Sequence, residues 1–108
     1  MRSERLSLPE LRERMPPLLD KAPVLQWLWG RLSDGRPQAI RNIVAALDDA
    51  FPKETPWAAQ PPRRQQQRAG VLVSRLNQRL AALGTRYRVL PGLPRQTYQV
   101  RMPGDQST

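Results

Sequence analysis

Prolines constrain this chain more than any other feature, because they limit where helices and strands can run. Twelve of the 108 residues are proline, and they include the pairs 16–17 and 61–62 and the close neighbours 91 and 94. Proline lacks a backbone N–H, so it is tolerated in the first turn of a helix or in a turn but not in the interior of a regular element. The prolines therefore divide the chain into short segments.

Three helices are expected in the first half of the chain. They cover residues 7–15, 22–35 and 36–51. The first begins with a capping box, in which Ser7 is followed three positions later by Glu10, and Pro16 and Pro17 are expected to stop or kink it. The apolar residues of the other two helices recur at the spacing of one buried face. They are Val24, Leu25, Leu28 and Leu32, and then Ile40, Ile43, Val44, Leu47 and Phe51.

The longest helix is expected over residues 61–83, after a proline-rich loop in which Trp57 is the only strong apolar anchor. Gly84 follows this helix and is suited to its C-terminal cap. The apolar residues of the helix share one face. They are Leu72, Val73, Leu76, Leu80 and Leu83.

Residues 86–102 show period-two alternation on both sides of a Pro-Gly-Leu-Pro turn, which predicts a β-hairpin. Its arginines face solvent and its tyrosines and valines face the core. The predicted fold is mainly α with a C-terminal β-hairpin, which is the winged helix-turn-helix arrangement. In that arrangement helix 61–83 enters the DNA major groove and hairpin 86–102 is the wing.

The predicted organisation has one folded domain with short extensions. Residues 1–22 form an N-terminal helical arm, 23–102 the winged-helix domain and 103–108 a tail. Leu8, Leu11 and Met15 give the arm an apolar face, which is expected to contact either the core or a second copy of the chain in a homodimer.

Positive charge is concentrated in the second half of the chain. Residues 1–54 hold nine basic and eight acidic side chains, whereas residues 55–104 hold nine arginines and no acid. Such asymmetry indicates a polyanionic partner, either nucleic acid, an acidic membrane surface or an acidic protein. Double-stranded DNA is the favoured partner, because charge of one sign on a folded, arginine-rich half is typical of DNA-binding domains.

Several functions are excluded or made improbable by missing residue types. The chain has no cysteine and no histidine, so disulfides, thiolate metal sites and the commonest general base are absent. Nucleophile and phosphate-loop motifs are also missing. We therefore expect no enzyme, no cofactor and no small-molecule substrate. No apolar run approaches about 20 residues, and no secretory signal is present. We therefore expect a cytoplasmic protein that does not associate with membranes.

Nine residues are the candidate DNA contacts. Arginine suits phosphate and guanine, and glutamine suits adenine. An ordinary solvated basic face is the alternative for all of them, and Arg75 could instead pair with Asp48 or Asp49. The candidates are Arg64, Gln65, Arg68, Arg75 and Arg79 on the helix and Arg86, Arg88, Arg95 and Arg101 on the hairpin.

The segment RAGVLVSRLNQRLAALG, followed by a hairpin containing TYQV, resembles the C-terminal effector domain of OmpR/PhoB-type response regulators. The family's Asp-x-His is replaced here by Gly70 and Leu72, and the Gly-x-Gly before the wing tyrosine is missing. The resemblance implies a winged-helix fold and DNA contacts, without a receiver domain or its control by phosphorylation. The matching positions are Arg68, Val71, Val73, Ser74, Arg75, Leu76, Leu80 and Tyr98.

The sequence thus predicts a small basic DNA-binding protein acting as a transcriptional regulator. The alternative is a protein-interaction module, an inhibitor or adaptor that binds an acidic partner such as a polymerase or a nucleic-acid-processing complex. Exposure of Trp27, Trp29 or Trp57 would favour it, because aromatic anchors dominate such interfaces. RNA is a third option, for which the basic face lacks stacking aromatics.

Overall fold

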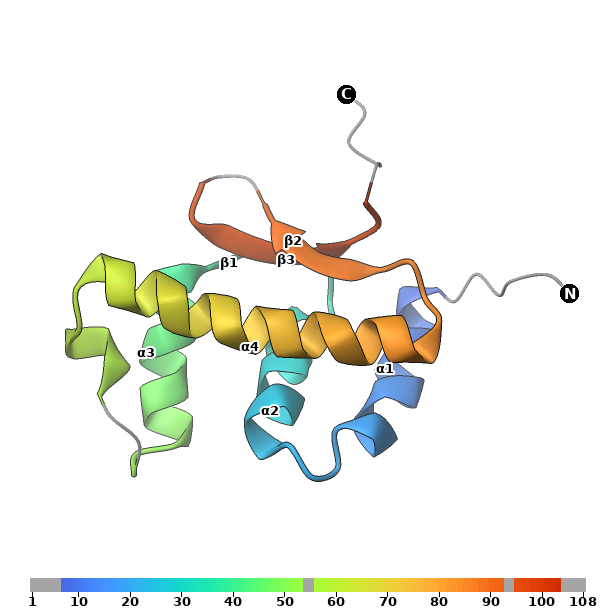
Figure 1. Cartoon of the computed structure of the whole chain (residues 1–108), viewed down its shortest axis with the longest axis horizontal. Coiled ribbons are helices and arrows are strands. Elements are labelled where there is room, and N and C mark those ends of the chain that lie inside the picture. The colour runs from blue at the N-terminus through green and yellow to red at the C-terminus, as the bar shows by residue number, and fades with distance from the viewer. Residues whose placement is uncertain (1–6, 54–55, 93–94, 104–108) are drawn as a thin grey trace, which may run out of the picture.

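Four helices and a small sheet build the molecule, whose computed structural model describes residues 7–53, 56–92 and 95–103 (Figure 1). The longest helix, α4, runs along the molecule with the sheet on one side and the other three helices on the opposite side. The expected mainly helical fold ending in strands is therefore confirmed. The helices are α1 (Leu8–Leu18), α2 (Pro23–Leu32), α3 (Ile40–Ala50) and α4 (Pro62–Leu83), with a short 3₁₀ turn η1 (Trp57–Ala59) before α4.

The sheet has a strand that the sequence pattern did not reveal. It consists of β1 (Gln38–Ala39), β2 (Arg88–Pro91) and β3 (Thr97–Arg101), all antiparallel in the order β1–β3–β2. Strand β1 directly precedes α3 and pairs with β3, the central strand. Two residues are too few to show a period of two, which is why only a hairpin was expected. The tip of the expected turn, residues 93–94, lies outside the described residues.

Helix α1 begins as expected but ends later. The backbone N–H of Ser7 donates to Glu10 Oε1 at 2.8 Å, and the N–H of Glu10 donates to Ser7 Oγ at 3.3 Å, which completes the capping box. Of the stop or kink expected at Pro16 and Pro17, the stop is wrong, because the helix continues through both prolines to Leu18. Both prolines lie in its last turn, and neither can donate an N–H to the carbonyls of Arg12 and Glu13, so this turn is held by fewer backbone hydrogen bonds.

The N-terminal segment belongs to the main core. Leu11, Met15 and Leu19 have no exposed surface and share a cluster with apolar residues of α2, α4 and the sheet. Leu8 is half-buried against the same cluster. Of the two roles expected for the arm, contact with the core is the one the structure displays, and Leu11 and Met15 offer no free surface to a second copy.

Helix α4 has the expected bounds and buried face. Pro62 occupies its first turn, and Gly84 caps it with a left-handed backbone at φ 85°. Leu83 is only half-buried, whereas Ala69 joins the buried face. From Ala69 to Leu80 this helix therefore presents one side to the core and leaves the opposite side to solvent.

Candidate functional site

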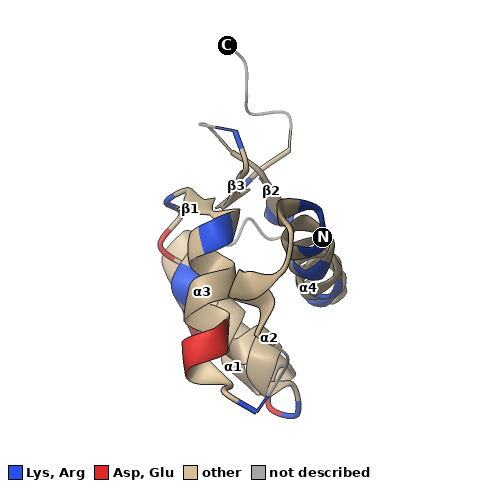
Figure 2. Cartoon of the chain, turned by 90° about the vertical axis from the view of Figure 1, so that its left-hand side faces the viewer, with Lys and Arg blue, Asp and Glu red and all other residues tan. Residues whose placement is uncertain are grey.

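The exposed side of α4 is a continuous strip of polar residues around one apolar side chain. Its members recur at alternating spacings of three and four, which aligns them on one face of a helix. Val71 at its centre is 44% exposed, and no acidic residue occurs anywhere on α4 (Figure 2). We call this surface the outward strip; it comprises Arg64, Gln67, Val71, Ser74 and Gln78.

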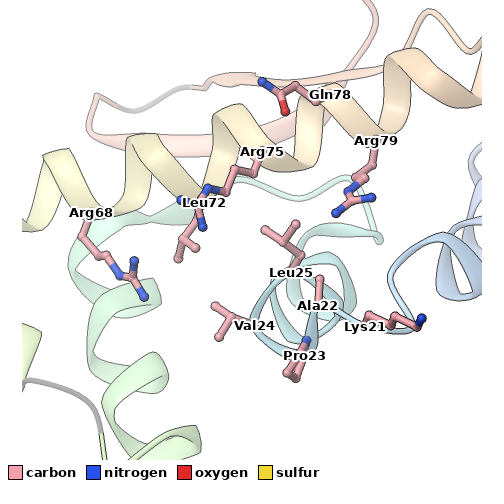
Figure 3. A pocket seen from close by; sticks show the side chains of 10 residues that line it. All are labelled: Lys21, Ala22, Pro23, Val24, Leu25, Arg68, Leu72, Arg75, Gln78 and Arg79. Atoms are coloured by element: carbon pink, nitrogen blue, oxygen red, sulfur yellow. The ribbon is translucent and has the colours of Figure 1, made fainter.

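Three of the four arginines predicted on this helix lie together on one flank of the strip, and Arg64 lies on the strip itself. The side chains of Arg68, Arg75 and Arg79 all lie on the side of α4 that faces the shorter helices, with Arg68 in front of α3 and Arg79 directed toward α2 (Figure 3). Between α2 and α4 they border a hollow of about 540 Å³, whose other lining residues are Lys21, Ala22, Pro23, Val24, Leu25, Leu72 and Gln78. We call it the α2–α4 hollow.

Gln65 and Arg68, predicted to read bases near the start of α4, both contact η1 and its flanks. Gln65 is half-buried, and its Nε2 donates to the carbonyl oxygens of Ala58 at 3.1 Å and Gln60 at 3.0 Å. The Arg68 guanidinium carbon lies 5.4 Å from the centroid of the Trp57 ring, a cation–π contact. These interactions fasten η1 to α4, and they restrict how far either side chain can reach outward.

Arg75 is not paired with the acids of α3, contrary to the alternative raised by the sequence. The Asp48 carboxylate accepts hydrogen bonds from the backbone N–H groups of Trp57 at 2.9 Å and Ala58 at 2.7 Å, and so caps η1. Within the described ranges, Arg75 and Arg79 make no hydrogen bond or ion pair. Their charges are available to an external anion.

The four hairpin arginines fall into two groups. Arg88 donates from Nη1 to the carbonyl oxygens of Thr85 and Tyr87, both at 2.7 Å, and Arg101 donates from Nη2 to the Pro91 carbonyl at 2.9 Å. Arg86 and Arg95 are exposed and have no such partner in the part of the chain that the structure describes. The hairpin therefore presents two free guanidinium groups, while the other two support its backbone.

This surface includes residues that the nine predicted DNA contacts left out. Gln67, Ser74, Gln78 and Lys21 were not among the nine candidates, although a helical wheel drawn opposite the leucine face would have found the first three. Asn77, the neighbour of Gln78 on α4, is half-buried and bonds to Val89 in β2.

Other kinds of site find no support in the described part of the chain. No group of three or more acidic, histidine or cysteine side chains is placed to hold a metal ion there. No helix among the described residues has the length and apolar character needed to cross a membrane. Comparison with protein-family models, with curated proteins and with solved structures finds no match for this chain.

Proposed function

We propose that residues 23–102 form a winged helix-turn-helix domain that binds double-stranded DNA, with α4 in the major groove and β2–β3 as the wing. The element order supports this proposal: a helix, a short strand, two helices and two strands, with the first strand paired to the last. Winged-helix proteins insert the helix that precedes the hairpin into the groove. A role as a cytoplasmic transcriptional regulator follows as part of the same proposal.

The observation that carries the proposal is the acid-free exposed side of α4, held rigidly by a buried opposite side. Glutamine side chains match the donor and acceptor pattern of adenine in the major groove, and an apolar side chain suits the thymine methyl group. Gln67, Val71 and Gln78 provide these groups in the outward strip. We propose that the strip reads base edges while the flanking arginines contact phosphates, which fix register without reading sequence.

Fluorescence anisotropy with a random-sequence duplex tests DNA binding at several salt concentrations. If about six arginines contact phosphates, log K falls with log salt at a slope of about −5. The double variant Arg75→Ala/Arg79→Ala is expected to reduce the magnitude of that slope by about 2. A slope near zero, or no binding at low salt, would overturn the proposal.

The matched control removes the same charge from other helices. Arg12 on α1 and Arg41 on α3 are both exposed, so Arg12→Ala/Arg41→Ala lowers the net charge by two without touching α4. We expect this control to keep the salt slope of the unmodified protein. An equal loss in both double variants would mean that net charge alone, and not the surface of α4, attracts the duplex.

The protein-interaction alternative lacks the feature that would have favoured it. Trp29 is 3% exposed within the core, and Trp27 and Trp57 are half-buried. Trp27 packs edge-to-face on Phe51 with ring centroids 6.2 Å apart. None of the three tryptophans is thus a free anchor for a partner. A protein-interaction module becomes the favoured function only if the protein does not bind duplex DNA.

A further inference from the structure

The α2–α4 hollow has a charge pattern that the fold itself does not require. Its lining contains Lys21, Arg68, Arg75 and Arg79 and no acidic residue. Figure 3 shows the three arginine side chains on the same side of α4, with that of Arg79 directed toward α2. Four cations therefore border one concave surface.

Placing like charges close together is unfavourable unless an opposite charge lies near them. Arg75 and Arg79 are four residues apart on one helix, a spacing at which equal charges repel, and neither has a partner among the residues described. Asp20 borders an adjoining hollow with Arg79 and Lys21 and does not line this one. An anion in the α2–α4 hollow would relieve the repulsion.

The opposite wall of the hollow adds partial positive charge to that of the arginines. Helix α2 has no side-chain cap and no acid in its first turn. No capping side chain therefore accepts a hydrogen bond from the N–H groups of Val24 and Leu25. Both residues line the hollow. The N-terminal end of a helix attracts anions, which reinforces the preference already set by the arginines.

We propose that the α2–α4 hollow is a binding site for a phosphate group. Guanidinium forks bind phosphate oxygens with two parallel charge-assisted hydrogen bonds, and Arg75 and Arg79 supply two such forks. Val24, Leu25 and Leu72 provide apolar lining beside them, suited to the sugar or carbon portion of a phosphorylated compound. The phosphate belongs either to the backbone of a bound duplex or to a free phosphorylated ligand. The proposed phosphate site does not depend on the proposed binding of DNA.

Titration of the isotopically labelled protein with inorganic pyrophosphate, followed by NMR, tests the site in the absence of DNA. Saturable shifts are expected at the backbone amides of Val24 and Leu25 and at the Nε–H groups of Arg75 and Arg79. The variant Arg79→Gln is expected to weaken binding by about tenfold or more, since it removes charge-assisted hydrogen bonds. Arg41→Gln removes one charge from an exposed position on α3, outside the hollow, and should leave the affinity unchanged.

Non-saturable shifts spread over all arginines, or equal weakening by the two variants, would overturn the site. Adding a duplex to the pyrophosphate-loaded protein then identifies the source of the phosphate. Displacement of pyrophosphate supports a backbone phosphate as the natural occupant, and simultaneous binding of both supports a free phosphorylated ligand. A protein that binds pyrophosphate in the hollow but no duplex would refute the proposed DNA binding and leave the site standing.

Discussion

At the scale of single residues, Asn77 shows a polar side chain of α4 serving the fold. Its Oδ1 accepts from the backbone N–H of Val89 at 2.7 Å, and its Nδ2 donates to the Val89 carbonyl at 3.1 Å. Val89 is itself buried in β2. One carboxamide thus satisfies both backbone groups of a strand residue and fixes the sheet to α4.

Replacing Asn77 by alanine is expected to lower the free energy of unfolding by about 1–3 kcal/mol, because the Val89 backbone groups lose their partner. Urea unfolding followed by circular dichroism measures the change. The neighbouring Gln78 is exposed on the same helix, so Gln78→Ala should stay within about 0.5 kcal/mol of the unmodified protein. Similar losses for the two variants would contradict the role assigned to Asn77.

Two glycines of α4 are expected to respond oppositely to the same substitution. A methyl group on Gly70 would meet nothing nearer than the Tyr98 hydroxyl at 3.9 Å, an ordinary contact, so Gly70→Ala should stabilise the protein by about 0.5–1 kcal/mol. Gly84 has φ 85°, so Gly84→Ala should destabilise it by about 1–2 kcal/mol. Thermal unfolding measures both, and shifts of the same sign would refute the argument.

At the scale of elements, the capping box makes the start of α1 sensitive to acid. The backbone N–H of Ser7 lowers the pKa of Glu10 below its ordinary value of 4.5, and the Ser7 hydroxyl and the charge of Arg14 lower it further. A group whose pKa falls on folding stabilises the native state above its unfolded pKa. That contribution is lost as the pH falls through the lowered pKa.

The variant Glu10→Gln should therefore be less stable than the unmodified protein at neutral pH, and the difference should shrink as the pH falls below 4.5. Urea unfolding over a series of pH values measures it. Glu13 is an exposed carboxylate on the same helix but outside the capping box, so Glu13→Gln is the control for removing one negative charge from α1. A constant difference between Glu10→Gln and the unmodified protein would argue against the cap.

The elements also differ in how far the sequence predicts them. Helix α4 was predictable because it has a long leucine face between Pro62, which favours the start of a helix, and Gly84, which favours its end. Both signals depend only on neighbouring residues. Strand β1 was not predictable, because its pairing depends on β3, far away along the chain. The same reason limits the site. Whether Arg101 is free for a ligand depends on the Pro91 carbonyl, which the pairing of β2 with β3 brings to it, whereas the strip opposite the leucines follows from helical spacing alone.

At the scale of the whole molecule, α1 is part of the folded unit and not an appendage. Leu11, Met15 and Leu19 are completely buried, and removing one large core side chain costs about 2–5 kcal/mol. Typical domains have only about 5–15 kcal/mol of stability in total. The core of residues 23–102 is therefore incomplete without α1.

We expect a fragment that starts at residue 23 to lose cooperative thermal unfolding, which calorimetry measures. Within the full chain, Leu11→Ala should cost about 2–5 kcal/mol, whereas Leu18→Ala should cost clearly less, since Leu18 is 39% exposed. A fragment that unfolds cooperatively at the temperature of the full chain would show that α1 is dispensable.

The central position of β3 has a consequence for synthesis on the ribosome. Its neighbours in the sheet are β1, made nearly sixty residues earlier, and β2, made immediately before it. Contacts between distant segments slow folding, because a long loop must close first. The nascent chain can form its helices early, but the edges of β1 and β2 stay unpaired until residues 97–101 leave the exit tunnel. During that interval the unpaired strand edges are open to pairing with other chains.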